Sequence, residues 1–167
     1  MFWTSGRALF IINGMEPIAF THGEPLLARV RAALGVPPRD PRQLSPLVLA
    51  YVGDTVYDLY VRTRLILTSD ATAHGLHVQA ARLVCAEGQA AALRSILDKL
   101  TEEETAIYKR GRNSHLGTVP KHAAIQDYRA ATGLEALLGF LYLDGRDGRL
   151  TELMALLLPP KEVEPHA

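Results

Sequence analysis

Apolar residues along this chain recur mostly three or four positions apart, which is the period of a helix that buries one face. Two stretches, residues 45–67 and 125–143, are long and almost wholly apolar, and we expect them to form two central helices. Ser45 can cap the first of them, and Pro46 fits its first helical position, where a missing N–H costs nothing. No alternating pattern of useful length predicts a β-strand. The pattern therefore predicts one all-α domain.

Four shorter stretches also show helical periodicity. They are residues 24–34, 76–100, 101–110 and 150–158. Thr101, followed three residues later by Glu104, forms a capping box that begins the third of them. Gly111 stands where it can close that helix in the left-handed conformation. Gly88 marks a weak point or a close packing site inside the 76–100 helix.

The ends of the chain carry less pattern than its middle. Residues 1–22 are expected to form a poorly ordered N-terminal extension, and residues 159–167, which begin with two prolines, a loose tail. Residues 23–158 contain every predicted helix. We therefore expect this middle segment to be the single folded domain.

Composition narrows the class of protein. The 167 residues are 48% hydrophobic, enough for a packed core and too apolar for a disordered chain. The formal net charge is zero, so any attraction to nucleic acid must come from a local patch. The lone Cys85 excludes an intrachain disulfide and is expected to be a small core residue in a reduced compartment. No apolar run reaches the roughly 20 residues that span a bilayer, so we expect no membrane segment and a cytoplasmic protein.

Each of the two long apolar helices carries an acid in its interior, Asp54 in the first and Glu135 in the second. Burying an unpaired carboxylate costs several kcal/mol or more. Gly53 and Gly133 lie beside the two acids and allow two backbones to approach, so both carboxylates could face one spot. Two carboxylates with phosphate oxygens suffice to bind Mg²⁺, which can activate a water for phosphodiester hydrolysis.

Simpler interpretations of these acids remain open. Each carboxylate could pair with an arginine, such as Arg62, Arg82 or Arg129, and spacing alone slightly favours this alternative. Asp58 lies one turn after Asp54 on the same face and could assist it. The preferred interpretation of Asp58 is an ordinary surface acid.

A second feature is a basic run that precedes the Glu135 helix. Its cationic and amide side chains are Lys109, Arg110, Arg112, Asn113 and Lys121. Such side chains on a glycine-containing loop suit phosphate oxygens, so they are candidates for RNA binding. A solvated basic loop is the commoner fate of such a run. We prefer RNA binding to that alternative only because the basic run occurs together with the acid pair.

Three blocks of this sequence carry a family resemblance when taken together. Residues 49–62 read LAYVGDTVYDLYVR, residues 109–121 contain KRGRN and GTVPK, and residues 128–139 contain YR and TGLEALLG. These blocks resemble, in the same order, the Mini-III ribonucleases, the short class of ribonuclease III that lacks a double-stranded-RNA-binding domain. The resemblance covers most of residues 45–143.

The resemblance implies a ribonuclease III-type endonuclease domain that works as a homodimer on double-stranded RNA. Asp54 and Glu135 match the acids of the family motifs and would be the catalytic metal ligands, with one Mg²⁺-dependent site in each protomer. Family members trim the precursor of large-subunit (23S) ribosomal RNA. Because this chain has neither a separate RNA-binding domain nor excess charge, a ribosomal protein on the precursor is an expected helper.

The sequence also departs from full-length ribonuclease III. That enzyme carries further acids at the positions of Leu47, Ala50 and Thr132, and Mini-III relatives can carry an aspartate at the position of Ala124. A rival interpretation is therefore a domain that has lost cleavage and only binds RNA or a ribosomal protein. A helical dimerisation module is a third. The intact Asp54 and Glu135 favour the enzyme.

Overall fold

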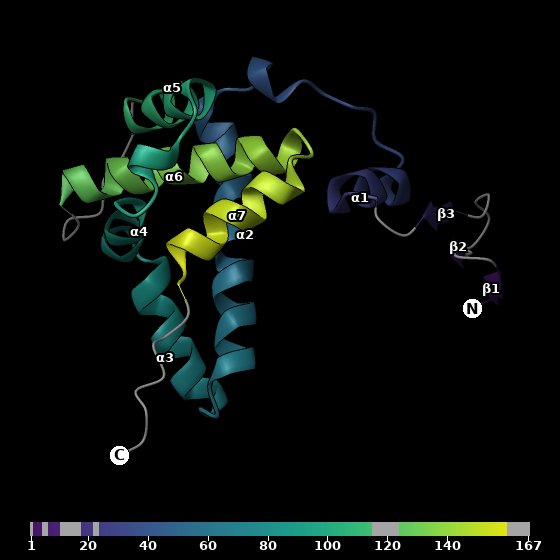
Figure 1. Ribbon diagram of the computed structural model, residues 1–167, viewed down its shortest axis with the longest axis horizontal. Helices are drawn as coiled ribbons and strands as arrows, with labels where there is room; N and C mark the ends of the chain where they lie inside the picture. The colour runs from purple at the N-terminus through teal and green to yellow at the C-terminus, as the bar shows by residue number, and fades with distance from the viewer. Residues whose placement is uncertain (1, 5–6, 11–17, 22–23, 115–123, 160–167) are drawn as a thin grey trace.

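The computed structural model describes residues 2–4, 7–10, 18–21, 24–114 and 124–159 (Figure 1). Three short strands come first, and helices form the rest. In chain order the elements are β1 (Phe2–Thr4), β2 (Arg7–Phe10), β3 (Ile18–Thr21), α1 (Leu26–Leu34), the 3₁₀ turn η1 (Pro41–Gln43), α2 (Pro46–Thr68), α3 (Ala73–Val84), α4 (Ala86–Leu93), the 3₁₀ turn η2 (Leu97–Lys99), α5 (Glu102–Arg112), α6 (Ile125–Leu143) and α7 (Asp147–Leu157). The predicted all-α domain is confirmed.

Helix α6 is the centre of this domain. Every residue from Ala131 to Leu141 is buried except Glu135. Helices α2, α4, α5 and α7 all pack against α6, as Figure 1 shows. A helix that is apolar on all sides is stable only when other elements cover it, which explains this arrangement. Within the described part of the chain, no helix combines the length and the apolarity that a bilayer crossing requires.

Helices α2 and α6 touch through their main chains. A Cβ atom added at Gly53 would overlap the carbonyl oxygen of Glu135, and one added at Gly139 would overlap the carbonyl oxygen of Leu49. Only glycine permits such a close approach. Gly133 permits a similarly close approach between α6 and α5, since a Cβ there would lie 2.6 Å from the ring of Tyr108 in α5.

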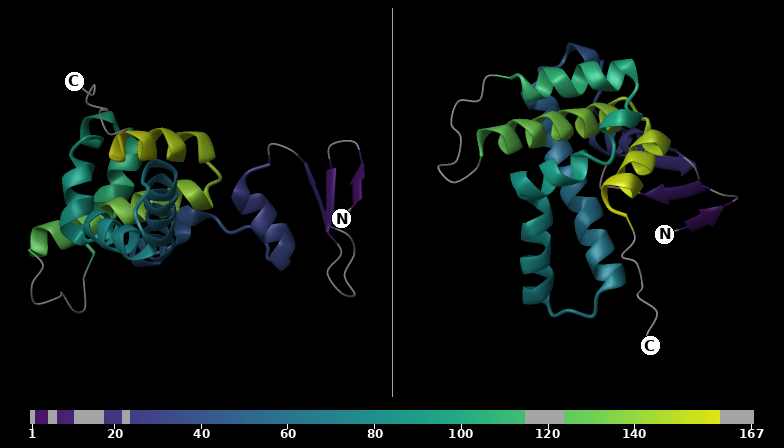
Figure 2. Two further views of the ribbon diagram at one scale, coloured as in Figure 1. Left: turned by 90° about the horizontal axis from the view of Figure 1, so that it is seen from below. Right: turned by 60° about the vertical axis from the view of Figure 1, so that its left-hand side comes forward.

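The predicted helix over residues 76–100 is wrong, because the chain breaks at Cys85 into α3 and α4. Cys85 has an extended backbone (φ −68°, ψ 158°), and its Sγ accepts a hydrogen bond from the Gly88 N–H at 3.4 Å, as an N-cap does. It is exposed, so its expected place in the core is also wrong. Figure 2 shows α3 running beside α2 below this break.

Helix α5 begins as predicted and ends later. The capping box of Thr101 and Glu104 is confirmed, and Glu104 also pairs with Arg149 of α7 at 2.9 Å. The helix continues through Gly111 to Arg112. Gly111 is needed for packing and does not close the helix, because a Cβ there would lie 2.7 Å from the Cβ of Ala136 in α6.

The two ends of the chain differ from the expected pattern. The strands form an antiparallel sheet in the order β1-β2-β3, which the sequence did not predict because runs of three or four residues are too short to show alternation. Helix α7 begins at Asp147, three residues before its predicted start. The division into residues 1–22, 23–158 and 159–167 stays a prediction, and residues 160–167 lie outside the described part.

Candidate active site

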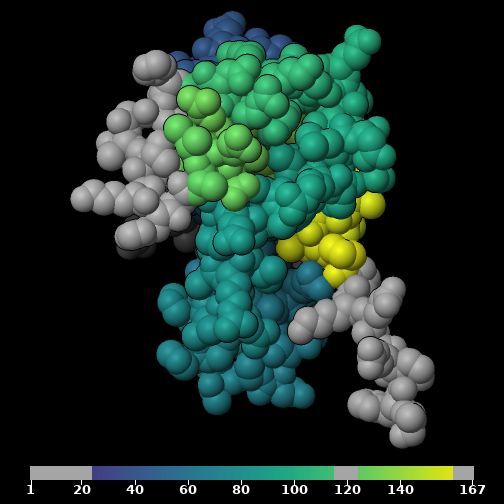
Figure 3. Space-filling model, turned by 90° about the vertical axis from the view of Figure 1, so that its left-hand side faces the viewer, coloured from purple at the N-terminus to yellow at the C-terminus, as the bar shows by residue number. Residues whose placement is uncertain are grey.

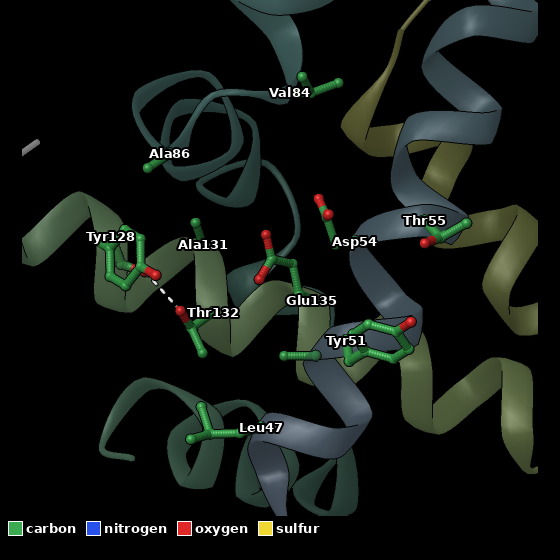
Figure 4. Close-up of a pocket in the computed structure, with 11 residues that line it drawn as sticks. Leu47, Tyr51, Asp54, Thr55, Val84, Ala86, Tyr128, Ala131, Thr132 and Glu135 are labelled. Carbon is green, nitrogen blue, oxygen red and sulfur yellow. Dashed lines mark hydrogen bonds between the residues drawn. The ribbon is translucent and has the colours of Figure 1, made fainter. Parts of the chain in front are cut away.

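A cleft of about 470 Å³ lies between α2, the beginning of α6 and the junction of α3 with α4 (Figure 4). Its wall is mostly apolar or aromatic, and two acids stand in it. The residues that line it are Leu47, Ala50, Tyr51, Asp54, Thr55, Val84, Ala86, Tyr128, Ala131, Thr132 and Glu135. The break at Cys85 shapes this cleft, because the residues on either side of it, Val84 and Ala86, both line the wall.

Asp54 and Glu135 come together in this cleft, as the sequence analysis expected of their positions. Figure 4 shows the two carboxylates side by side in the same space, Asp54 from α2 and Glu135 from α6. The cause is the main-chain contact described above. It places Gly53 against the carbonyl of Glu135, so the acid that follows Gly53 lies next to the acid on α6.

The surroundings of the two acids disfavour their charges. Burial raises the pKa of Glu135 to about 7, and repulsion from Asp54 adds to the effect, while the nearby amide of Gln89 opposes it. Burial also raises the pKa of Asp54, and the nearby Asp58 raises it further. Among the described residues neither Asp54 nor Glu135 forms an ion pair. The cleft therefore holds two neighbouring acids with no cationic side chain to balance them.

The geometry does not support the alternative in which an arginine pairs with Asp54 or Glu135. Arg62, one of the arginines considered as a partner, pairs with Asp58 at 2.6 Å, one turn apart on α2. Asp58 is half-buried and held by this pair, so it acts as a structural acid and not as a freely solvated one. Its second carboxylate oxygen, Oδ1, is buried without a hydrogen-bond partner in the described part of the chain.

The acid pair fits a hard divalent cation. Carboxylate oxygens are the ligands that Mg²⁺ prefers, and this ion keeps several waters when proteins bind it. No group of three or more His, Cys, Asp or Glu side chains among the described residues is placed to hold a metal. Asp54 and Glu135 would thus be the protein's own ligands. Waters and phosphate oxygens would complete the shell.

Non-acidic residues occupy the cleft where longer family members carry acids. Leu47, Ala50 and Thr132 all line the wall. The hydroxyl of Thr132 donates a hydrogen bond to the Tyr128 carbonyl at 3.0 Å, within its own helix. Ala124 precedes α6 as its N-cap residue, is exposed and makes no side-chain cap. None of these four side chains adds a carboxylate to the site.

The basic residues gather at the end of α5, which packs against α6. Lys109, Arg110 and Arg112 belong to the last helical turn and not to a loop, and Asn113 caps it; all four are exposed. A Cβ added at Gly111 would lie 3.0 Å from the carbonyl oxygen of Thr132, so this turn packs against α6, but no residue of α5 is among those that line the cleft. Figure 3 views the side where α6 begins, with α5 above it and α3 below. Lys121 lies outside the described residues.

One residue near the acids escaped the sequence analysis. Gln89 of α4 is 1% exposed, and its Nε2 donates a hydrogen bond to the carbonyl oxygen of Val84, which lines the cleft. A signal was present, because Gln89 precedes the buried Leu93 by four positions and so shares its face. A polar side chain on the core-facing side of a helix is a candidate for a buried hydrogen bond.

Known proteins resemble this chain over most of its length. Residues 47–146 match the model of the ribonuclease III domain. The chain is 45% identical to the Mini-ribonuclease 3 of Clostridium tetani, over 72% of this chain and 80% of that protein. It is 47% identical to the Mini-ribonuclease 3 of a Thermoanaerobacter species, over 68% and 80%. A crystal structure from Fusobacterium nucleatum is 28% identical, with a TM-score of 0.65, and the match covers 72% of this chain and 96% of that one.

Proposed function

This chain belongs to the ribonuclease III domain family and is an endoribonuclease of the Mini-ribonuclease 3 kind, and from that premise we propose that it cuts double-stranded RNA with Mg²⁺, in the maturation of the 23S ribosomal RNA precursor. One observation carries the proposed mechanism. Asp54 and Glu135, from two helices, lie side by side in a cleft without a cationic side chain to balance them.

In this proposal Asp54 and Glu135 hold the metal ion and the cleft receives one phosphate of the RNA backbone. Members of the family generally use divalent metal ions. When bound, Mg²⁺ would supply a nucleophilic water at neutral pH and stabilise the charge that develops on the phosphate. Burial raises the pKa of Glu135 to about 7, and burial together with the nearby Asp58 raises the pKa of the more exposed Asp54.

The basic turn supplies the proposed contacts with the RNA backbone. Its members are Lys109, Arg110, Arg112, Asn113 and, outside the described part, Lys121. Phosphate contacts fix the register of a duplex on a protein without reading its sequence. This turn packs on α6, the helix that carries Glu135, so we propose that one bound duplex reaches both the basic turn and the cleft.

A homodimer is supported by the exposed side of α2. Large apolar side chains on this helix face solvent, and the helical period places most of them on one side. They are Leu47, Val48, Tyr51, Leu59, Ile66 and Leu67. Exposed apolar side chains gathered on one side of a helix are typical of an interaction site, and we propose that a second copy of the chain covers them. Leu59→Asp should give a monomer by analytical ultracentrifugation, and an unchanged mass would remove this interface.

The helper protein and the cellular compartment are inferred from the substrate. A neutral chain attracts an RNA duplex weakly at long range, so a ribosomal protein on the precursor would aid recognition. Equal cleavage rates on naked and protein-bound precursor would count against the helper. A cytoplasmic location follows from the proposed precursor. Fractionation that finds the protein elsewhere would contradict it.

The decisive experiment is cleavage of a labelled RNA duplex with Mg²⁺. Asp54→Asn and Glu135→Gln should each lower the rate by at least about 100-fold, because residues that only support metal ligands already cost 10–100-fold. Asp58→Asn is the matched control, since it removes the same charge one turn further along α2 and should leave the rate within about threefold. Circular dichroism would show that each variant is folded.

The rival interpretation, an RNA-binding domain without cleavage, predicts a different result. It draws on Leu47, Ala50 and Thr132, which stand where longer enzymes carry acids. In that case the native chain would bind the duplex and leave it intact at every Mg²⁺ concentration. A variant that restores an acid, Thr132→Asp, would then be the first to test for recovered cleavage.

A further inference from the structure

A second groove, of about 390 Å³, lies at the start of α2 and shares no lining residue with the cleft of the two acids. Most of its wall is apolar, and it includes Leu27 and Val30 of α1, Val36 of the connector after α1, and Val48 of α2. Figure 1 shows α1 set apart from the other helices, and none of its residues is buried. One copy of the chain therefore leaves the apolar side of α1 largely uncovered.

Among the described residues that line this groove, only Arg31 of α1 and Arg39 of the connector are charged. Neither forms an ion pair with an acid in the described part of the chain. The Nε atom of Arg31 is buried and has no hydrogen-bond partner there. A buried polar group without a hydrogen bond costs free energy. The groove therefore suits an occupant that brings an acid together with apolar side chains.

The far end of α2 carries such a combination. Ile66 and Leu67 are 66% and 77% exposed in its last turn, and Asp70 is exposed in the turn that leads to α3. Asp70 forms no ion pair with the described residues. We call residues 66–70 the α2–α3 corner. Within one copy the groove and the corner cannot meet, because they lie at opposite ends of α2.

The helical period places both ends on the same side of α2. Val48, Leu59 and Ile66 follow one another at 11 and 7 positions, close to whole turns of about 3.6 residues. Val48 lines the groove, and Ile66 in the corner lies about 27 Å further along the helix. If two copies pair these sides with antiparallel α2 helices about a two-fold axis, each groove meets the corner of the other copy. A parallel pairing would bring groove to groove and place arginine against arginine.

We propose that the groove binds the α2–α3 corner of a second copy. The apolar side chains of the corner pack against the wall of the groove, and Asp70 pairs with Arg31 and Arg39. This inference rests on the proposed homodimer and adds a contact made by α1. Helix α1 lies outside residues 47–146, which match the ribonuclease III domain, so the contact is an addition to that domain. It occurs twice in each dimer, because a two-fold pairing is reciprocal.

Charge reversal tests the proposal through the dissociation constant of the dimer, measured by analytical ultracentrifugation of the full chain. Asp70→Arg should raise this constant at least about tenfold, because it places like charges side by side across the interface. Arg31→Glu together with Arg39→Glu should do the same. All three changes together should return the constant to within about threefold of the native value, since they exchange the charges and keep the contact. Asp98→Arg, at an exposed acid in η2, is the matched control and should leave the constant unchanged.

Disulfide cross-linking tests the contact directly. The background is Cys85→Ser, because serine keeps an N-cap for α4 and removes the native thiol. Val36→Cys is then placed in the groove and Leu67→Cys in the corner. The two variants should form a linked dimer when they are mixed under oxidation, and neither should link when it is alone. Leu97→Cys in place of Val36→Cys is the matched control, since Leu97 is 44% exposed against 45% for Val36 and does not line the groove.

The outcomes separate this contact from the proposed homodimer. A native dimer whose dissociation constant is the same in the charge variants, or that gives no link between groove and corner, overturns the contact and leaves the pairing through α2 intact. The contact is also overturned if the exchange of all three charges restores nothing. A native chain that is monomeric at every concentration overturns both the homodimer and the contact.

Discussion

Asp54 and Glu135 face the same cleft, but their helices have different surroundings. Helix α2 keeps one side in solvent, and Asp54 is exposed on it, whereas α6 is covered on nearly every side and Glu135 is mostly buried. Burial raises the pKa of both acids, and that of Glu135 reaches about 7. The more buried acid, Glu135, therefore holds its proton into the neutral range, and a bound cation would favour its ionised form.

The largest expected effect comes from breaking the contact that brings the two acids together. Gly53→Ala would place a Cβ onto the carbonyl oxygen of Glu135, and because the obstacle is main chain, no side chain can move to relieve it. We expect a loss of at least about 3 kcal/mol in the free energy of unfolding, the upper part of the range for overpacking. Urea titration followed by circular dichroism would measure it.

Gly148→Ala is the control for that experiment. Gly148 lies in the first turn of α7, and an added Cβ there has nothing within 4 Å. The same substitution should change stability by no more than about 1 kcal/mol, in the stabilising direction. Equal effects at Gly53 and Gly148 would contradict the main-chain contact between α2 and α6.

The difference between the two acids should also appear in the pH dependence of stability. The folded state raises the pKa of Glu135 from 4.5 to about 7, so the native state binds the proton more tightly than the unfolded state. Its contribution is fully present below about pH 4.5 and is lost as the pH rises through about 7, a loss of about 3 kcal/mol.

Two variants isolate this contribution. Glu135→Gln should flatten the fall in unfolding free energy between pH 5 and pH 8, measured by urea titration against the native chain. Asp54→Asn should lower the pKa of Glu135, because it removes the like charge, and so should flatten the curve only in part. A native-like pH profile for Glu135→Gln would show that the cleft does not raise the pKa of this acid.

A smaller effect is expected when basic residues at the end of α5 are changed instead of the acids in the cleft. Removing Lys109 and Arg110 together, as alanines, should reduce the salt dependence of duplex binding by roughly one log–log slope unit for each phosphate that these side chains bind. Lys99→Ala, which changes an exposed lysine in η2, should leave the slope unchanged. Filter binding between 50 and 200 mM salt, about the range where such binding weakens most, would measure it.

The smallest effect is expected at Thr132, an uncharged residue in the wall of the cleft. The Thr132 hydroxyl donates only to the Tyr128 carbonyl in its own helix, so Thr132→Val should shift stability by no more than about 1 kcal/mol. Cleavage should stay within about twofold, since this hydroxyl serves neither acid. A tenfold loss in a cleavage assay, with stability retained, would give Thr132 a part in the chemistry.

Local signals in the sequence predicted much of the fold. Ser45 caps α2 through the Val48 N–H, and Thr101 with Glu104 begins α5, because a cap needs only residues within one turn. The break at Cys85 was missed because cysteine is not a usual cap. Gly111 was misread for a similar reason, since the need for a small residue there comes from Ala136, far along the chain.

The candidate site was predictable to a lesser degree. Single acids inside apolar helices are visible in a sequence, and the structure brings Asp54 and Glu135 to one cleft. Gln89 was not singled out, because an amide in an alanine-rich helix resembles a surface residue until its partners are known. Its helical position relative to Leu93 was the only local sign of burial.

The meeting of Gly53 with the Glu135 carbonyl has a consequence for how this enzyme can change over time. The spacing of the two acids depends on the backbones of two helices and not on the side chains around them. Replacements at Leu47, Ala50 or Thr132 can therefore accumulate without moving either carboxylate. Selection and laboratory evolution are free to reshape the wall of the cleft while the acid pair keeps its geometry.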